Sequence, residues 1–295
     1  MKKYLLLFVL FCGFVTFAPE LNGVLPFGVN PKQSHTEKEE PAFAVECVCG
    51  GKKTVLPLEE YVCIYLAEKG YASFPAEALK AMACVIRTRV FAGRIDSLKS
   101  RLSELPAAVT AAAEETRNEY VAYGGAPVNA VTHISSRSRT VSAEEAYGED
   151  VAYLRSVSTP EYDRGERAAE RTLTPQELCD ILCQNGFECD VTLRLNAWLT
   201  YVSRSESGRI KTVWLCGNCI SGEKLAQMLD LGSPDITIDI NGSTFVFRCY
   251  GEGDGVGLSE RGACVMAEEG KTYKEILVHY FSGAELCVNN PAQDG

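Results

Sequence analysis

Side chains suited to catalysis or binding gather in three short segments of this 295-residue chain. These are Glu68 with Lys69, the run containing His133, Ser136 and Thr140, and the glycine-rich run 251–259. A single carboxylic acid can serve as general acid and then general base when apolar surroundings raise its pKa. Glu68 is a candidate for that task. The alternative is that Glu68 and Lys69 form a solvated charge pair at the end of a helix.

His133 and the glycine-rich run could line a binding cleft. His133 is the only histidine in the middle of the folded region, and a structural histidine with satisfied hydrogen bonds is its alternative role. Gly253, Gly255 and Gly257 would allow the backbone to approach a ligand closely. A phosphate-binding loop is disfavoured because Asp254 would repel the anion and no Lys-Ser/Thr pair follows.

The first elements that must position these side chains are two amphipathic helices within residues 55–89. Apolar residues recur with helical spacing from Leu58 to Leu66, and Gly70 predicts the end of that helix. Pro75 predicts the first position of the second helix, whose apolar residues also share one face. On pattern alone, such a helical hairpin is a packing unit without chemistry.

Further expected helices alternate with antiparallel hairpins. In chain order they are a helix-like run at 92–116, strands at 118–123 and 127–131, a helix starting at Thr174-Pro175, a hairpin around Gly208, a helix at 220–231, a hairpin around Asn241-Gly242 and a terminal helix at 266–281. These predictions rest on turn residues, capping residues and alternating polarity. The chain is therefore expected to have a mixed α/β (α+β) fold, with the helical hairpin packed beside antiparallel hairpins and a glycine-rich loop.

The N-terminus predicts where the protein works. Residues 1–18, two lysines and then an apolar run, are typical of a secretory signal peptide or an N-terminal membrane anchor, and both remain open. Residues 19–44 are rich in proline, glycine, lysine and glutamate, which indicates a flexible tether. The folded domain is expected at 45–287, with a disordered tail at 288–295. We therefore expect an extracytoplasmic protein, either secreted or anchored to the cell membrane.

Charge and cysteine content limit the possible ligands. A formal net charge of −10 argues against a nucleic-acid partner and is compatible with a neutral, sugar-rich substrate. Apart from Cys12, twelve cysteines remain, an even number that is consistent with disulfides. Cys216 and Cys219 have zinc-ligand spacing, and Cys179 and Cys183 share a helical face. No second pair with histidine completes a metal site, so we expect structural cysteines, free or paired, and no metal or cofactor.

Several segments together resemble the stage II sporulation protein D (SpoIID) family. The opening signature is L-E-E-Y-V at 58–62 followed by S-F-P-A-E-A-L-K-A-M-A at 73–83. Segments 133–140 and 146–157 are similar to two later family motifs, and 251–263 is similar to the family's G-x-G-H-G-V-G-M-S-Q-x-G-A loop. The resemblance covers Val55 to Leu286 with the segments in the family order, which identifies a divergent member.

The resemblance implies a lytic transglycosylase of peptidoglycan glycan strands, or an amidase-enhancer relative. In such an enzyme one carboxyl is acid and base, because the sugar's own 6-hydroxyl is the nucleophile. The family's glutamate aligns with Lys69, so the adjacent Glu68 is the catalytic candidate. The residues expected to line the sugar cleft are Lys69, His133, Ser136, Thr140, Gly253, Asp254, Gly255, Gly257 and Ser259. Other departures from the family pattern are Asp254 for a histidine, Glu260 for a glutamine, and Arg137 and Ser138 for glycines.

Two functional hypotheses follow from this resemblance. In the first, the protein cleaves glycan strands in sporulation or cell-wall remodelling. In the second, it keeps the cleft without the chemistry and binds the wall to modulate another cell-wall hydrolase. The expected partners are peptidoglycan glycan strands, other hydrolases or sporulation proteins, and a membrane through the N-terminal segment. A third possibility is a disulfide-stabilised exported domain of unrelated function.

Overall fold

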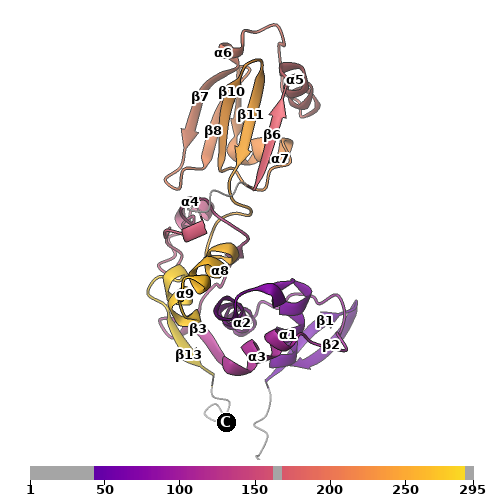
Figure 1. Cartoon of the computed structure of the whole chain (residues 1–295), viewed down its shortest axis with the longest axis vertical. Coiled ribbons are helices and arrows are strands. Elements are labelled where there is room, and N and C mark those ends of the chain that lie inside the picture. Colours follow the sequence, from indigo (N-terminus) through magenta and orange to yellow (C-terminus); the bar gives the residue numbers. More distant parts are fainter. Residues whose placement is uncertain (1–42, 162–167, 290–295) are drawn as a thin grey trace, which may run out of the picture. The chain divides into compact units, whose positions relative to one another are not determined.

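The computed structural model describes residues 43–161 and 168–289, so the expected signal or anchor, nearly all of the tether and most of the tail lie outside the described residues. Helices alternate with small, mainly antiparallel sheets (Figure 1), which confirms the expected mixed α/β fold. The helices are α1 (Leu58–Glu68), the 3-10 helix η1 (Tyr71–Ser73), α2 (Ala76–Phe91), α3 (Ala107–Glu115), α4 (Ala143–Tyr147), α5 (Pro175–Gln184), α6 (Leu195–Trp198), α7 (Gly222–Met228), α8 (Glu260–Glu268) and α9 (Tyr273–Tyr280). The strands are β1 (Ala44–Cys49), β2 (Lys52–Pro57), β3 (Glu119–Tyr123), β4 (Ala126–Pro127), β5 (Thr132–His133), β6 (Ala169–Leu173), β7 (Leu199–Arg204), β8 (Ile210–Leu215), β9 (Asn218–Ser221), β10 (Ile236–Asn241), β11 (Thr244–Cys249), β12 (Leu258–Ser259) and β13 (Glu285–Val288).

Most strands pair with a neighbour in sequence, whereas β3-β13, β5-β12 and β6-β11 join segments far apart in the chain. The local hairpins are β1-β2, β3-β4, β7-β8-β9 and β10-β11. Strand β13 pairs antiparallel with β3, and β12 pairs parallel with β5 so that Ser259 lies opposite His133. This last pair brings the glycine-rich run beside the segment that contains His133.

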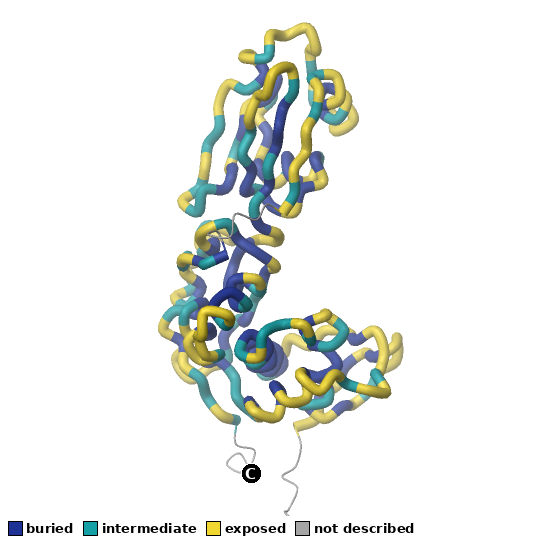
Figure 2. The backbone as a smooth tube through the Cα atoms, viewed as in Figure 1, coloured by how far each residue is buried: buried dark blue, intermediate teal, exposed yellow. Residues whose placement is uncertain are grey.

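Helices α1 and α2 form the predicted hairpin, and their apolar residues share a first core with residues of β1, β2, α3, α8 and α9. Gly70 has a φ of +78°, the left-handed conformation that only glycine adopts without strain, and it follows the end of α1. Pro75 is the residue just before α2 and has extended backbone angles. Eleven of the 16 residues of α2 are buried, and Figure 2 shows much of this helix as buried. A helix covered on nearly all sides is a core element.

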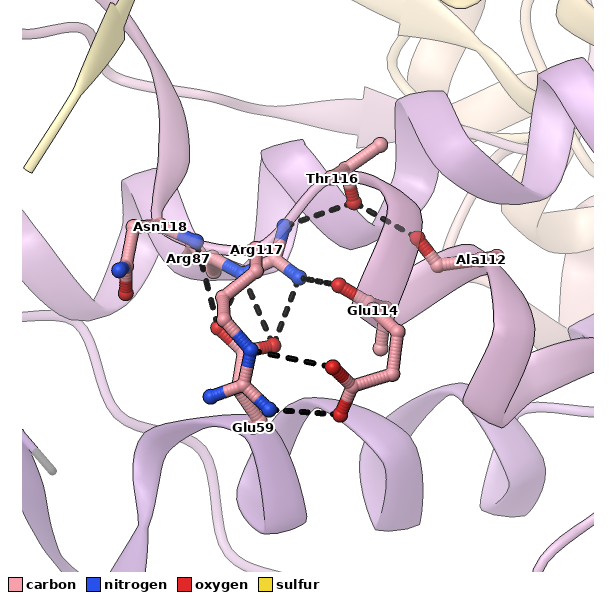
Figure 3. Close-up of polar contacts among 8 residues, drawn as sticks. Glu59, Arg87, Ala112, Glu114, Thr116, Arg117 and Asn118 are labelled. Carbon is pink, nitrogen blue, oxygen red and sulfur yellow. Dashed lines mark hydrogen bonds and ion pairs between the residues drawn. The ribbon is translucent and has the colours of Figure 1, made fainter. Parts of the chain in front are cut away.

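A buried ion pair joins the two helices. The Arg87 side chain of α2 is fully buried, and its guanidinium donates to both carboxylate oxygens of Glu59 at 2.6–3.1 Å. It also donates to the Ala113 carbonyl at 2.7 Å. A further bond, at 3.0 Å, goes to Thr116 Oγ1 (Figure 3). These contacts connect α1, α2 and the end of α3. A buried guanidinium needs such partners because an unpaired charge is costly in the interior.

A second core lies within residues 168–250. It contains Trp198, Phe245 and Phe247 together with apolar residues of α5, α7 and strands β8 to β11. The predicted start of α5 is confirmed as a capping box. Thr174 Oγ1 accepts from the Glu177 amide, and the Glu177 carboxylate accepts from the Thr174 amide.

Two predicted helices differ from the observed ones. The helix-like run 92–116 is helical only in α3, because Pro106 immediately precedes that helix and the residues before it form an irregular segment. The predicted terminal helix 266–281 is two helices, α8 and α9. They are separated near Gly270, whose φ is +88°, and α9 begins at a new capping box formed by Thr272 and Glu275.

A helix that spans a membrane needs about 20 mostly apolar residues. Among residues 43–161 and 168–289, no helix combines the length and apolar character that a membrane span requires.

Candidate functional site

The glycine-rich run lies directly against the segment that contains His133. The amides of Ile134 and Ser135 donate to the Glu252 carbonyl at 3.1 and 3.2 Å, and the Glu252 amide donates back to the Ser135 carbonyl at 2.9 Å. Farther along, Ser259 pairs with His133 in the parallel ladder. Two of the three segments named from sequence are therefore brought together by backbone pairing.

The glycines of this run are required by close contacts within the chain itself. Gly253, Gly255 and Gly257 all have positive φ, between +75° and +98°. A Cβ at Gly255 would lie 2.2 Å from Arg209 Nη2, and one at Gly257 would lie 2.3 Å from the Val131 carbonyl oxygen. At Gly253 the nearest atom would be Cβ of His133, at 3.0 Å. The local need for glycine is thus explained without a ligand.

His133 is buried and fully hydrogen-bonded. Its Nδ1 lies 3.1 Å from the Val256 carbonyl, and its Nε2 lies 2.6 Å from Ser136 Oγ. A carbonyl can only accept, so Nδ1 carries the proton and Nε2 accepts from the Ser136 hydroxyl. Burial lowers the pKa of His133 to about 4, so the ring is neutral at physiological pH. This geometry holds Ser136 in a fixed orientation.

Glu161 is a buried carboxylate that the sequence reasoning did not identify. Only 5% of its surface is exposed, and its oxygens accept from the Ser136 amide, from Ser259 Oγ at 2.8 and 2.9 Å, and from Thr159 Oγ1 at 2.9 Å. Burial raises the pKa of Glu161, and these donors partly oppose that rise. No periodic pattern marks position 161, because its partners come from three separate segments.

Arg137 and Thr140, which follow His133 in the sequence, make contacts that connect neighbouring segments. Thr140 is buried, and its Oγ1 accepts from the Val157 amide at 2.9 Å while its own amide donates to the Val157 carbonyl at 2.8 Å. Arg137, which stands where the family resemblance expects a glycine, places its guanidinium 4.1 Å from the centre of the Tyr250 ring and 3.5 Å from the Asp235 carboxylate. Both side chains hold neighbouring segments together.

Asp254 lies at the edge of a cavity of about 400 Å³. Its carboxylate accepts from the Tyr147 hydroxyl and from the Val256 amide. Arg209 donates to the carbonyls of Gly253 and Asp254 at 3.2 and 2.7 Å. The polar residues that line the cavity are Glu145, Tyr147, Ser205, Arg209, Lys211, Glu223 and Asp254. Val141, Ala146, Ile210 and Pro234 also line it, so the cavity has a mixed polar and apolar surface.

Glu68 and Lys69 contact other parts of the chain. Both carboxylate oxygens of Glu68 accept backbone N–H groups, from Lys99 and Ser100, each at 2.9 Å. The exposed Lys69 places Nζ 5.4 Å from the centre of the Tyr65 ring. Within the described ranges, no hydrogen bond or ion pair links Glu68 to His133 or to the glycine-rich run.

A different carboxylate lies at the turn of the helical hairpin. Glu260, the first residue of α8, is half-buried and accepts from the Tyr71 hydroxyl at 2.7 Å and from Thr132 Oγ1 at 3.2 Å. Arg89 donates to Thr132 Oγ1 at 3.0 Å and to the Tyr65 hydroxyl at 3.2 Å. Burial, and then the nearby carboxylate of Glu260, raise the pKa of Tyr71, so this hydroxyl remains a donor.

The sequence did mark position 260, as a departure from the family pattern, but only the fold places it beside Tyr71.

In the parts of the chain that the structure describes, no group of three or more His, Cys, Asp or Glu side chains is arranged to hold a metal ion.

Comparison with known proteins gives a consistent result. Residues 51–133, from the β1-β2 turn through His133, match the family model described as SpoIID, stage II sporulation protein. The chain is 25% identical to stage II sporulation protein D of Bacillus subtilis (strain 168), over 97% of this chain and 96% of that protein. It is 27% identical to stage II sporulation protein D of Bacillus amyloliquefaciens, over 78% of this chain and 74% of that protein. It is also 25% identical to an uncharacterized protein of Brachyspira hyodysenteriae, over 80% of this chain and 68% of that protein. The chain is therefore similar over most of its length to stage II sporulation protein D, and its residues 51–133 match the SpoIID family model.

Proposed function

We propose that this protein acts on the cell wall in sporulation, as a lytic transglycosylase of peptidoglycan glycan strands in which Glu260 is the acid and base. The match of residues 51–133 to the SpoIID model, and the similarity of most of the chain to stage II sporulation protein D, support the sporulation and cell-wall role. The enzymatic step is the finer part of the proposal and rests on the site itself. We further propose that the protein works outside the cytoplasm, tethered or released through its N-terminal segment.

The observation that carries this proposal is the position of Glu260. Its carboxylate is half-buried at the start of α8, next to Ser259, and it is oriented by the hydroxyls of Tyr71 and Thr132. A carboxyl held in this way by two donors keeps one geometry, as a group that transfers a proton must. It also contacts Tyr71 of η1, two residues after Lys69, the position with which the family's catalytic glutamate aligns.

One carboxyl is sufficient for the reaction. In the acid form, Glu260 protonates the glycosidic oxygen, and the bond between that oxygen and the anomeric carbon breaks. The 6-hydroxyl oxygen of the same sugar then bonds to the anomeric carbon, and its proton returns to the Glu260 carboxylate. The products are a 1,6-anhydro end and a new free hydroxyl on the leaving sugar, so no water, metal or cofactor is consumed.

Glu68 remains the rival candidate for the acid. Two backbone N–H groups at 2.9 Å already satisfy its oxygens, and both come from the irregular segment at 99–100. Glu68 could reach a substrate only if this segment moved. In Glu260, by contrast, both donors are side-chain hydroxyls and both bind Oε1.

The test is digestion of glycan strands from which the stem peptides have been removed, followed by mass spectrometry of anhydro-muramic ends. We expect these ends from the native protein and from Glu68→Gln, and their loss in Glu260→Gln. Glu104→Gln, which changes an exposed carboxyl in a loop, is the matched control. Loss of product in Glu68→Gln with activity retained in Glu260→Gln would assign the acid to Glu68 instead.

A second function is supported by one specific observation. Lys69 occupies the place where the family resemblance puts the acid, and its neighbour Glu68 is engaged by the backbone. A protein with this site could bind glycan strands without cutting them and modulate another cell-wall hydrolase. Retention of glycan strands by the native protein with no anhydro ends, in the same assay, would favour this function over the enzymatic one.

A further inference from the structure

A second cluster of reactive side chains lies outside the proposed site, within the core formed by residues 168–250. Cys179 and Cys183 lie on α5, Cys189 lies in the connector between α5 and α6, and Cys216 follows β8. The Sγ atoms of Cys189 and Cys216 are 3.1 Å apart, a separation at which two thiols are in direct contact. An S–S bond is about 2.05 Å long, so bonding requires an approach of only about 1 Å.

The backbone around both cysteines is fixed by hydrogen bonds. Asn218 Nδ2 donates to the Glu188 carbonyl at 2.6 Å and to the Cys216 carbonyl at 3.1 Å, which joins the two cysteine-bearing segments. The Cys216 amide donates to the Trp198 carbonyl at 2.7 Å. Cys216 has a φ of +52°, an uncommon conformation for a residue with a Cβ. This φ and that of Gly217, +79°, belong to the two-residue hairpin turn that joins β8 to β9, so the turn itself fixes the backbone of Cys216.

We propose that Cys189 and Cys216 form a disulfide bond that ties the connector between α5 and α6 to the turn between β8 and β9. The oxidant would be a disulfide, either a low-molecular-weight one or that of an oxidoreductase. One thiolate attacks the oxidant and forms a mixed disulfide, and the second thiolate then displaces the oxidant's sulfur. The two cysteines lose two protons and two electrons, and the oxidant's S–S bond becomes two thiols.

The solvent exposure of the two cysteines determines which thiol reacts first with the oxidant. Cys189 is half-exposed, whereas Cys216 is buried, so Cys189 forms the mixed disulfide and Cys216 completes the bond. Burial, followed by contact with the thiols of Cys179 and Cys216, raises the pKa of Cys189. Because the thiolate is the reacting form, we expect oxidation to become faster as the pH rises.

Two other cysteines border the pair and define the competing outcomes. The Cys179 thiol contacts the Cys189 carbonyl at 3.6 Å, and Cys183 lies one helical turn from Cys179. Four thiols in one region could also hold a zinc ion, although no such group within residues 43–161 and 168–289 is arranged to hold one. The short distance between Cys189 and Cys216 favours a direct bond between them.

The experiment uses the full chain, incubated in a buffer of oxidised and reduced glutathione. Free thiols are alkylated, the protein is denatured and digested without reduction, and the peptides are identified by mass spectrometry. We expect a cross-linked pair containing Cys189 and Cys216, and we expect that pair to disappear when the digest is reduced. The cross-link should form faster at pH 8.5 than at pH 6.5.

Variants and metal analysis separate the alternatives. Cys219→Ser, which changes an exposed cysteine of β9, is the matched control and should keep the cross-link, whereas Cys216→Ala should abolish it. The wild-type peptide map needs no variant, so a misfolded Cys216→Ala protein would not affect the result. Cys189 and Cys216 both alkylated in fully oxidised buffer, a bond from Cys189 to Cys179 or Cys183, or one equivalent of zinc in the anaerobically purified chain would each overturn the proposal.

Discussion

The Tyr71 hydroxyl donates a 2.7 Å hydrogen bond to Oε1 of Glu260, a residue 189 positions later in the chain. This contact joins η1, at the turn of the helical hairpin, to the start of α8. It places a carboxylate beside the hairpin turn, whereas the glutamate expected there from sequence, Glu68, faces the irregular segment at 99–100.

The first prediction concerns this contact. Tyr71→Phe removes the donor and should lower the free energy of unfolding by about 1 kcal/mol, because the bond is to a carboxylate that is half-buried. In a double-mutant cycle with Glu260→Gln, measured by urea unfolding, the two changes should be non-additive by roughly 0.5–1 kcal/mol. Additive effects would mean that the hydrogen bond contributes nothing to folding.

The second prediction concerns the ion pair between α1 and α2. Glu59→Gln removes the charge that balances the fully buried Arg87, and should destabilise the protein by about 3–5 kcal/mol. The matched control is Glu114→Gln, which breaks the exposed pair with Arg117 shown in Figure 3 and should cost at most about 1 kcal/mol. Urea unfolding of both variants checks the difference. Equal losses would show that burial does not govern the strength of these pairs.

The third prediction is a pH dependence from His133. Its pKa in the folded protein is about 4, below the ordinary value of 6.5, so between these values the unfolded chain binds a proton that the folded one does not. Because of His133, the free energy of unfolding therefore increases by roughly 3 kcal/mol as pH rises from about 4 to 6.5. His133→Asn should flatten the stability profile in that window relative to the native protein.

The pKa of Glu161 is shifted upward, opposite to that of His133, so its effect on stability should run the other way with pH. Burial raises its pKa above the unfolded value, so its contribution is fully present below pH 4.5 and is lost as pH rises through the folded pKa. In Glu161→Gln, stability should fall more steeply on acidification than in the native protein. A shallower fall would contradict the assigned direction of the Glu161 shift.

The fourth prediction separates backbone strain from close contact among the glycines. Gly257→Ala places a Cβ 2.3 Å from the Val131 carbonyl oxygen, in addition to adopting a positive φ. Gly270→Ala has a similar φ but open space around the new methyl group. We expect a loss of about 1 kcal/mol for Gly270→Ala and a further 1–3 kcal/mol for Gly257→Ala, measured by thermal unfolding.

The sequence alone determined features whose physics is local. Gly70 ends α1 because glycine adopts a positive φ without steric cost, and Thr174 begins α5 because its side chain satisfies a free amide at the first turn. Gly242 likewise marks the β10-β11 hairpin, although Asn241 pairs with Thr244 and the two turn residues are Gly242 and Ser243. Each of these signals involves residues within a few positions of one another.

The break between α8 and α9 shows where such signals compete. The apolar pattern continues through residues 266–281 and favours one helix, but Gly270 and the Thr272 cap favour an end and a new beginning. Both sets of residues were visible in the sequence. In the folded chain α8 and α9 both pack against α2, and each contributes residues to the core there.

Tertiary structure alone decided the chemistry that each acidic side chain can offer. Glu68 and Glu260 were both noted from sequence, yet only the fold gives Glu68 two backbone donors and gives Glu260 two hydroxyl donors. Glu161 carried no sequence signal, although Ser136, Thr159 and Ser259 converge on it. The reason is physical. Burial and hydrogen bonding set the state of a carboxyl, and both depend on residues far away in the chain that only folding brings together.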